Sequence, residues 1–195
     1  MSEKVAFIGI GRMGGPMATH LVKAGHEVAV YDTDSRKVEA FATDHGCRHA
    51  MSAADAAENA VYVATCVGGN AESFNVTQGE SGAFNAMTNG GVFVDHNTMT
   101  AQAAEKTAEA ADALDIHYLD APVSGAEELA NAGKLAVMLG GSKKAVSKAG
   151  PFLAAYAETA EHIGPSGHGQ LTKMVNQILI SANMQGLAEL SLIHI

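Results

Sequence analysis

The sequence contains little cysteine and no long hydrophobic run. Its 195 residues include two cysteines, Cys47 and Cys66, and no tryptophan. Neither cysteine has the spacing of a metal site and each lies near an apolar run, so we expect two buried free thiols. The longest apolar runs are shorter than the ~20 residues that a membrane-spanning helix requires. The start, MSEKVAFIG, lacks the basic region and long apolar stretch of a signal peptide. These absences predict a cytoplasmic protein without disulfides or membrane spans.

Basic residues are also scarce. Lysine and arginine number 12 against 21 aspartate and glutamate, which gives a net charge of −9. This charge repels a phosphate backbone, so we expect no binding to nucleic acid. There are nine histidines, but no pair has a carboxylate at convincing ligand spacing, and His45 and His49 flank Gly46 instead of a helical turn. We therefore predict no metal site.

What the chain does contain is a regular alternation of two patterns. Short β-rich segments alternate with alanine-rich helical segments, the clearest of which are residues 12–25, 35–44 and 100–114. Strands separated by helices of this length form parallel βαβ units, which pack as a right-handed doubly wound sheet. The expected strands are residues 5–8, 27–31, 47–49, 61–67, 91–95, 116–120 and 135–141. The pattern predicts an α/β fold of the Rossmann type with a mainly parallel sheet.

The alternation stops at residues 161–169, EHIGPSGHG, where glycine and proline interrupt it. Only a helical pattern follows, so we predict one domain over residues 1–164 and the start of a helical domain over 165–195. One helix cannot bury its own apolar side, so we expect the chain to be truncated and its helix to pack on another helix. The end, LSLIHI (190–195), fits that helix poorly and resembles translated sequencing adapter, so we expect residues 191–195 to be non-native.

A glycine-rich loop follows the first strand. The stretch VAFIGIGRMGGPMATHL places Gly9, Gly11 and Gly14 in the spacing G-x-G-x-x-G, between a strand and a helix. Such glycines allow a tight turn, close approach to a pyrophosphate and close packing of helix on strand. The loop residues expected to bind a dinucleotide are Gly9, Ile10, Gly11, Arg12, Met13 and Gly14.

Asp32 ends the second strand of this βαβ unit, 18 residues after Gly14. A carboxylate there can bond the adenosine ribose hydroxyls and repels a 2′-phosphate, which favours NAD over NADP. Arg36 lies close enough to keep NADP open as an alternative.

A thin polar stripe runs along the last helical segment. Lys173, Asn176, Gln177 and Asn183 fall on one side of the helix, while most of the circumference is apolar. Taken alone, this stripe favours a side that faces water. A lysine on an otherwise apolar helix could instead face a cleft.

Three stretches together resemble the signature blocks of the β-hydroxyacid dehydrogenases, a family that includes 3-hydroxyisobutyrate dehydrogenase and 2-hydroxy-3-oxopropionate reductase. They are FIGIGRMGGPMATHLVKAGHEV (7–28), DAPVSG (120–125) and GPSGHGQLTKMVNQ (164–177), in the order of the family. The resemblance implies a Rossmann-type domain, a helical C-terminal domain joined by a long helix, and an active site between them.

The resemblance also implies roles for single residues. Lys173 matches the catalytic lysine, and Asn176 and Gln177 match the substrate-binding positions one turn further on. Ser124 and Gly125 match the loop that holds the substrate carboxylate. The positions that match contacts of the cofactor are Val67, Gly68 and Thr98.

Several positions depart from the family pattern. His20 and Gln177 replace asparagines, and CVGGN (66–70) replaces a Leu-Pro stretch. Ala126 and Leu129 occupy positions where glycines are customary, and their side chains could narrow the pocket, which leaves the substrate open.

The resemblance implies an NAD(P)-dependent oxidoreductase that acts on a small carboxylate-bearing hydroxyacid or its semialdehyde, as a homo-oligomer at full length. Because the missing domain of the family closes the site, we expect this chain alone to be inactive. Burial would lower the pKa of Lys173 and fit it to act as general acid and base. His96, at a strand end, could line the nicotinamide pocket. Two alternatives remain: a non-catalytic NAD-binding fragment, and an imine-reductase-like enzyme, against which Lys173 counts.

Overall fold

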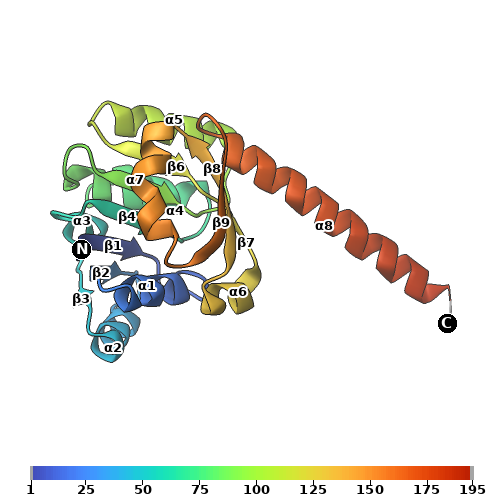
Figure 1. Cartoon of the computed structure of the whole chain (residues 1–195), viewed down its shortest axis with the longest axis horizontal. Helices are drawn as coiled ribbons and strands as arrows, with labels where there is room; N and C mark the ends of the chain where they lie inside the picture. Colours follow the sequence, from blue (N-terminus) through green and yellow to red (C-terminus); the bar gives the residue numbers. More distant parts are fainter. Residues whose placement is uncertain (1, 194–195) are drawn as a thin grey trace.

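The computed structural model describes residues 2–193, and these form a nine-stranded sheet with helices packed on both sides (Figure 1). The predicted Rossmann-type fold is confirmed. The strands are β1 (Lys4–Ile8), β2 (Glu27–Tyr31), β3 (Arg48–His49), β4 (Tyr62–Thr65), β5 (Val92–Asp95), β6 (His117–Asp120), β7 (Val123–Ser124), β8 (Leu135–Gly141) and β9 (Ala157–Gly164). The helices are α1 (Gly14–Lys23), α2 (Ser35–His45), α3 (Ala53–Ala57), α4 (Asn70–Gln78), the 3-10 turn η1 (Ala83–Asn85), α5 (Ala101–Asp112), α6 (Ala126–Ala132), α7 (Lys143–Leu153) and α8 (His168–Leu192).

The strand order creates a crevice at the carboxyl ends of β1 and β4. Six strands pair in parallel in the order β3-β2-β1-β4-β5-β6. The chain moves outward from β1 to β3 and then returns to the other side of β1 with β4. Ligands of open α/β sheets bind at such a reversal of strand order.

The remaining strands extend the sheet beyond β6. Strand β8 runs antiparallel to β6 and to β7, and β9 lies parallel to β8. Strands β6 and β7 flank the turn at Ala121 and Pro122, so the carboxyl end of β6 and the start of β7 both lie beside β8. Sheet pairing thereby places the DAPVSG segment beside the carboxyl ends of the parallel strands, where the glycine loop also lies.

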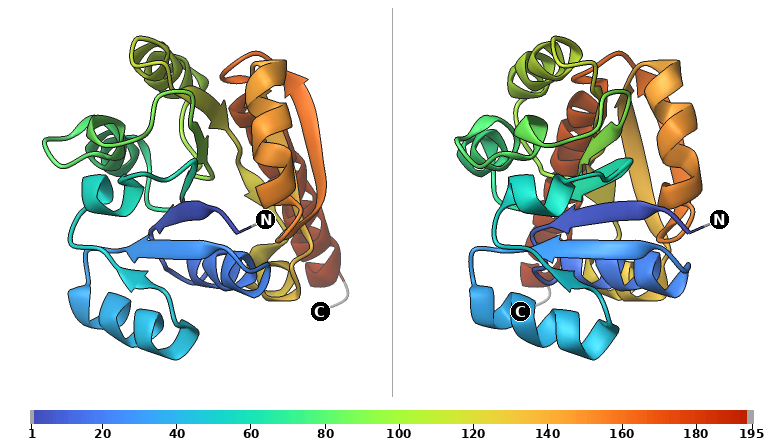
Figure 2. Two further views of the ribbon diagram at one scale, coloured as in Figure 1. Left: turned by 60° about the vertical axis from the view of Figure 1, so that its left-hand side comes forward. Right: turned by 90° about the vertical axis from the view of Figure 1, so that its left-hand side faces the viewer.

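Two apolar cores hold the helices to the sheet, one on each face. One contains α1 and α7, through Met17, Leu21 and Phe152. The other contains α3 and α5, through alanines that let the helices approach closely. The right panel of Figure 2 shows α5 and α7 on opposite sides of the sheet. Full burial of one large apolar side chain contributes about 1.5–3 kcal/mol, so these two layers stabilise the frame of the site.

The structure adds elements that the periodicity did not reveal. Helices α3, α4 and α6 and strand β9 occupy segments for which we predicted no element. Strand β9 is mostly exposed and carries polar side chains, so it lacks an apolar pattern. Its hydrogen bonds to β8 define it, and these depend on the tertiary fold.

Helix α8 extends away from the rest of the molecule (Figure 1). It begins after Gly167, which has φ 89°, and only Gly169 and Gln170 in it are buried. The exposed apolar side chains that follow include Val175, Ile178, Leu179, Met184, Leu187 and Leu190. The expectation that residues 190–192 fit a helix poorly is wrong, because α8 continues through Leu192. Residues 194 and 195 of that segment lie outside the described residues.

No helix within residues 2–193 combines the length and apolar character needed to cross a membrane. The same residues contain no group of three or more histidine, cysteine, aspartate or glutamate side chains placed to hold a metal ion. Cys47 and Cys66 are free and partly buried. Burial raises the pKa of both thiols, that of Cys66 to about 12, so neither is a thiolate at neutral pH.

Candidate functional site

The glycine loop joins β1 to α1 at the crevice. A side chain on Gly9, which has φ 87°, would collide with the backbone of Cys66, and one on Gly14 would overlap the carbonyl oxygen of Gly9. Gly11 instead has nothing within 4 Å of the position where a Cβ would lie. Gly9 and Gly14 are therefore required by packing, while Gly11 leaves open space in front of the loop, where a pyrophosphate can approach the backbone.

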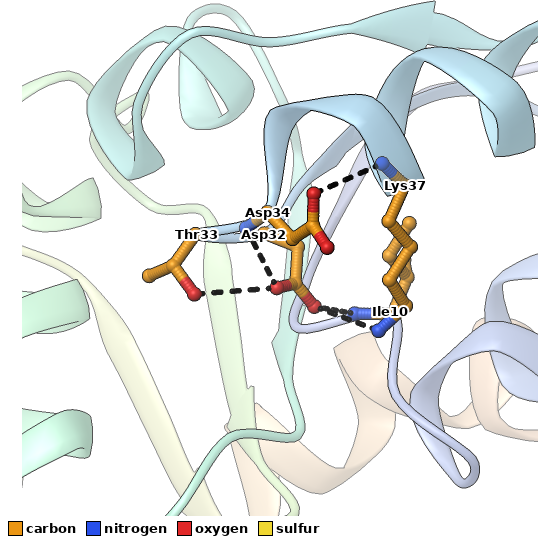
Figure 3. A network of polar contacts seen from close by, with 5 residues as sticks. All are labelled: Ile10, Asp32, Thr33, Asp34 and Lys37. Atoms are coloured by element: carbon orange, nitrogen blue, oxygen red, sulfur yellow. Dashed lines mark hydrogen bonds and ion pairs between the residues drawn. The ribbon is translucent and has the colours of Figure 1, made fainter.

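Asp32 fixes the shape of this loop from the end of β2 (Figure 3). Its Oδ2 accepts a hydrogen bond from the backbone N–H of Ile10 at 3.0 Å. Its Oδ1 accepts from the Thr33 hydroxyl and the Asp34 N–H at 3.4 and 3.3 Å. The carboxylate thus lies at the mouth of the loop, where it can also reach a ribose.

Lys37 is a neighbour of Asp32 that the sequence interpretation did not identify. Its Nζ lies 3.4 Å from Asp32 Oδ2, and both groups are drawn in Figure 3. Asp34 caps α2 by accepting from the Lys37 N–H, which places Lys37 in the first turn of that helix. Arg36, the cation that we considered from the sequence, makes no such contact among the described residues. The N-capping aspartate, three positions before Lys37, is the signal that could have found it.

A cavity of about 540 Å³ lies in front of the glycine loop. Its lining contains the predicted residues Gly9, Gly11, Arg12, Met13, Asp32, Val67 and Gly68. Ile10 and Gly14 are absent from this lining, since the N–H of Ile10 is bonded to Asp32 and Gly14 is packed against Gly9.

A second cavity, of about 740 Å³, adjoins the first and shares Met13, Cys66, Val67 and Gly68 with it. It brings together segments from β5, β7 and α8 that are far apart in the sequence. The predicted residues in its lining are Met13, Val67, Gly68, Thr98, Ser124, Gly125, Lys173 and Gln177. Asn176, which we also predicted, does not line it, and its Oδ1 is buried without a partner among the described residues.

Lys173 faces this second cavity and is partly buried. Its Nζ donates a hydrogen bond to the carbonyl oxygen of Val123 at 2.8 Å, beside Ser124. Burial lowers the pKa of the Lys173 ammonium below its ordinary value, because desolvation disfavours the charged form. The side of α8 that carries Lys173 therefore faces the second cavity.

His96 lines the second cavity, and both of its ring nitrogens are hydrogen-bonded inside the protein. Nδ1 lies 2.7 Å from the carbonyl oxygen of Ala121, and Nε2 lies 2.8 Å from the Tyr156 hydroxyl. Because a carbonyl oxygen can only accept, Nδ1 carries the proton and Nε2 accepts from Tyr156, which in turn accepts from Tyr62. Burial lowers the pKa of His96 to about 4, so the ring is neutral and ties β5 to the DAPVSG turn.

Asp95 is a buried carboxyl next to His96. It accepts from the hydroxyls of Ser73 and Tyr118, at 2.7 and 3.2 Å, and from the N–H of Asn97 at 3.0 Å. Burial raises its pKa to about 7. Asp95 lies behind the cavity and does not line it, so we assign it to the support of the loop at residues 96–99.

Comparison with known proteins shows the family to which the fold belongs. The family described as the NAD binding domain of 6-phosphogluconate dehydrogenase matches residues 4–164. An uncharacterized oxidoreductase of Shewanella frigidimarina is 46% identical over 186 residues, which cover 95% of this chain and 64% of that protein. The 3-hydroxyisobutyrate dehydrogenase of Pseudomonas aeruginosa is 35% identical over 185 residues, 95% of this chain and 62% of its own.

A solved structure of a related protein has the same fold as this chain. Mycobacterium tuberculosis 3-hydroxyisobutyrate dehydrogenase with L-serine superposes with a TM-score of 0.90 at 31% identity. The match covers 97% of this chain and 64% of that chain. The present chain thus spans slightly less than two thirds of the length of these relatives.

Proposed function

Because the chain belongs to the family described as the NAD binding domain of 6-phosphogluconate dehydrogenase, we propose that it serves in hydride transfer between a nicotinamide cofactor and a small β-hydroxyacid or its semialdehyde. One observation carries the proposal. A partly buried lysine, Lys173, faces a cavity that continues directly from the cavity of the glycine loop.

The cofactor half of the proposal rests on the first cavity. Its residues fit a dinucleotide: the open space over Gly11 admits a pyrophosphate, the start of α1 favours its negative charge, and Asp32 can accept from the adenosine ribose. When bound, the oxidised cofactor NAD⁺ would accept the hydride and the reduced cofactor NADH would supply it. Asp32 favours NAD, while Lys37 beside it offers a cation that could tolerate a 2′-phosphate.

The substrate half rests on the second cavity. The Ser124 hydroxyl and the backbone N–H groups around Gly125 would hold the carboxylate of the substrate, with Thr98 and Val67 on the cofactor side. Gln177 lines the cavity and can bond the reacting hydroxyl. The corresponding role for Asn176 stays a prediction, and a shift of its side chain would be required.

Lys173 would move the proton. In the oxidation direction its neutral amine takes the hydroxyl proton, and in the reduction direction its ammonium protonates the developing alkoxide. The lowered pKa brings the amine closer to the working range of pH, and the bond to Val123 holds Nζ beside Ser124.

The domain division remains part of the proposal. We propose that residues 1–164 are the cofactor-binding unit and that residues 165–195 begin a helical domain. The exposed apolar side chains of α8 support this division, because they would be covered in a longer or oligomeric protein. The cytoplasmic location stays a prediction from the sequence.

Exchange of Lys173 for alanine tests the proposal. In the full-length protein, we expect Lys173→Ala to lower turnover of short hydroxyacids by about 10²–10⁴-fold, the usual contribution of general acid–base catalysis. The Kd for NADH should change by less than about threefold, because Lys173 does not line the glycine-loop cavity. Absorbance of NADH measures turnover, and calorimetry measures binding.

Lys134→Ala, on an exposed lysine, is the matched control. Equal turnover in Lys173→Ala and in the control would remove Lys173 from the mechanism. NADH binding by the full-length protein with no turnover of any hydroxyacid would support a non-catalytic NAD-binding module instead. Consumption of NADPH that depends on an added amine would support an imine-reductase type of reaction.

A further inference from the structure

The first turn of α8 is held by a carboxylate from another part of the chain. Asp120, at the end of β6, is fully buried and accepts from the backbone N–H groups of Gly167 and Gln170 at 2.7 and 2.9 Å. A Cβ on Gly169 would lie 2.7 Å from the Asp120 carbonyl oxygen and 2.8 Å from its Oδ2. Met138 of β8 is equally close, so the absence of that side chain lets the start of the helix lie directly on β6 and β8. A carboxylate at a helix N-terminus is also favoured by the helix dipole.

Gln170 makes the second connection, between α8 and the loop that carries Thr98. Its side chain is 1% exposed. Oε1 accepts from the Met99 N–H at 3.0 Å, and Nε2 donates to the Asn97 carbonyl oxygen at 2.7 Å. One amide therefore bonds the backbone on both sides of Thr98, as a neighbouring strand would, and leaves Thr98 exposed in the second cavity.

Asn97 extends this connection to the loop after β4, which also lines the second cavity. Its Oδ1 accepts from the Val67 N–H, and its own N–H donates to Asp95. The loop after β4, the loop after β5 and the first turn of α8 are thus joined by side-chain hydrogen bonds. Lys173 lies three residues beyond Gln170 on the same side of the helix.

We propose that Gln170 is a positioning residue, which holds the loop at residues 97–99 and the start of α8 in register and so sets the place of Lys173 relative to the nicotinamide end of the cofactor. This rests on the proposed function of Lys173. Gln170 itself does not line the second cavity, so its effect would pass through Thr98 and Lys173.

Two binding measurements on this chain test the positioning role. ADP-ribose contains the part of NADH that the glycine loop would bind and lacks the nicotinamide. In Gln170→Met, which keeps the side-chain length but makes no such hydrogen bonds, we expect the Kd of ADP-ribose to stay within about twofold of the wild type. The Kd of NADH should rise about tenfold, because the Thr98 loop is no longer held.

Amine labelling of Lys173 gives a second readout, which needs no turnover. We expect the pH midpoint of its acetylation, followed by mass spectrometry, to be lower than the ordinary lysine pKa in the wild type. In Gln170→Met this midpoint should rise towards that ordinary value, because the Lys173 amine becomes more hydrated. Gln185→Met, on an exposed glutamine of the same helix, is the matched control and should change neither readout.

Gln170→Glu keeps the test decisive if the methionine variant does not fold. A glutamate retains the acceptor for Met99 but opposes Asn97 with a carboxylate oxygen. Its protonated acid can donate again, so we expect the ratio of the two Kd values to return towards the wild type as the pH is lowered.

Unchanged binding ratio and labelling midpoint in folded Gln170 variants would overturn the positioning role. That result is separate from a failure of the proposed function. If both readouts shift in the Gln170 variants while Lys173→Ala leaves turnover unaffected, Gln170 keeps its positioning role. Lys173 is then excluded as the acid–base residue.

Discussion

Single residues of the glycine loop carry two different requirements, and the structure separates them. Gly14 is surrounded, because a Cβ there would overlap Gly9 and come within 2.9 Å of Phe7. Gly11 faces open space. The same substitution should therefore affect stability at Gly14 and cofactor binding at Gly11.

Gly14→Ala should lower the free energy of unfolding by about 1–3 kcal/mol or more, as is usual for overpacking. Gly11→Ala should leave stability within about 0.5 kcal/mol and raise the Kd of NADH at least tenfold, since its methyl group would occupy the pyrophosphate space. Urea denaturation and calorimetry measure the two quantities. A stable Gly14→Ala protein that binds NADH normally would contradict this division.

His96 shows how burial converts a titratable group into a structural one. With its pKa lowered to about 4, the neutral ring contributes stability that is present above the unfolded value near 6.5 and is lost as the pH falls through 4. Between pH 7 and 5 this amounts to about 2 kcal/mol.

We therefore expect wild-type protein to lose about 2 kcal/mol relative to His96→Gln as the pH falls from 7 to 5. Urea unfolding at both pH values measures the difference. Nitrogen NMR of the wild type should show a protonated Nδ1 throughout this range. Titration of His96 near pH 6.5 would refute the assigned hydrogen-bond chain.

Among the elements, α6 begins under strain. Ala126 has φ 51°, and Gly125 before it has φ 138°. The family pattern has a glycine at position 126. The structure explains this preference, because the left-handed region costs a non-glycine residue about 1–2 kcal/mol. Leu129 packs over Gly125 and does not line the second cavity, whereas Ala126 does.

Ala126→Gly should raise the free energy of unfolding by about 0.5–1 kcal/mol, because relief of the strain exceeds the entropic cost of glycine. Ala132→Gly, at the end of the same helix, should lower it by a similar amount. Urea denaturation of both variants provides the comparison. A loss of stability in both would show that Ala126 is not strained.

Elements with a strong local pattern were predicted well. The strands at residues 27–31 and 135–141 agree with the structure at both ends, since each is an apolar β-rich run bounded by polar or glycine residues. Helix α4 was missed because its residues show little amphipathic pattern, and its start is capped by the contact of Glu72 with the Gly69 N–H. Strand β9 was missed because its pairing with β8 is not visible in its own residues.

At the scale of the whole molecule, α8 combines a fixed start with an unsupported remainder. Its first turn is bonded to Asp120 and to the Thr98 loop, whereas residues 178–192 are exposed along their length. Isolated helices of this length are marginal in water.

We expect amides of residues 178–192 to exchange with deuterium much faster than those of β1, β4 and β5, which are buried between two helical layers. Hydrogen-exchange mass spectrometry of the chain would show this gradient. Slow exchange throughout α8, at a concentration where the chain is monomeric, would contradict it. Protection that appears only at high concentration would indicate that a second copy covers the helix.

The sequence by itself determined the strand and helix alternation, the glycine turn and the presence of a lysine on an apolar helix, because these follow from periodicity and from the backbone freedom of glycine. Only the tertiary structure decided which way that lysine faces and what holds it. The bonds of Asp120 and Gln170 join residues 47 to 73 positions apart, and they form only when sheet pairing brings β5, β6 and the start of α8 to one edge. Spacing along the chain carries no information about such contacts, because their partners are chosen by packing.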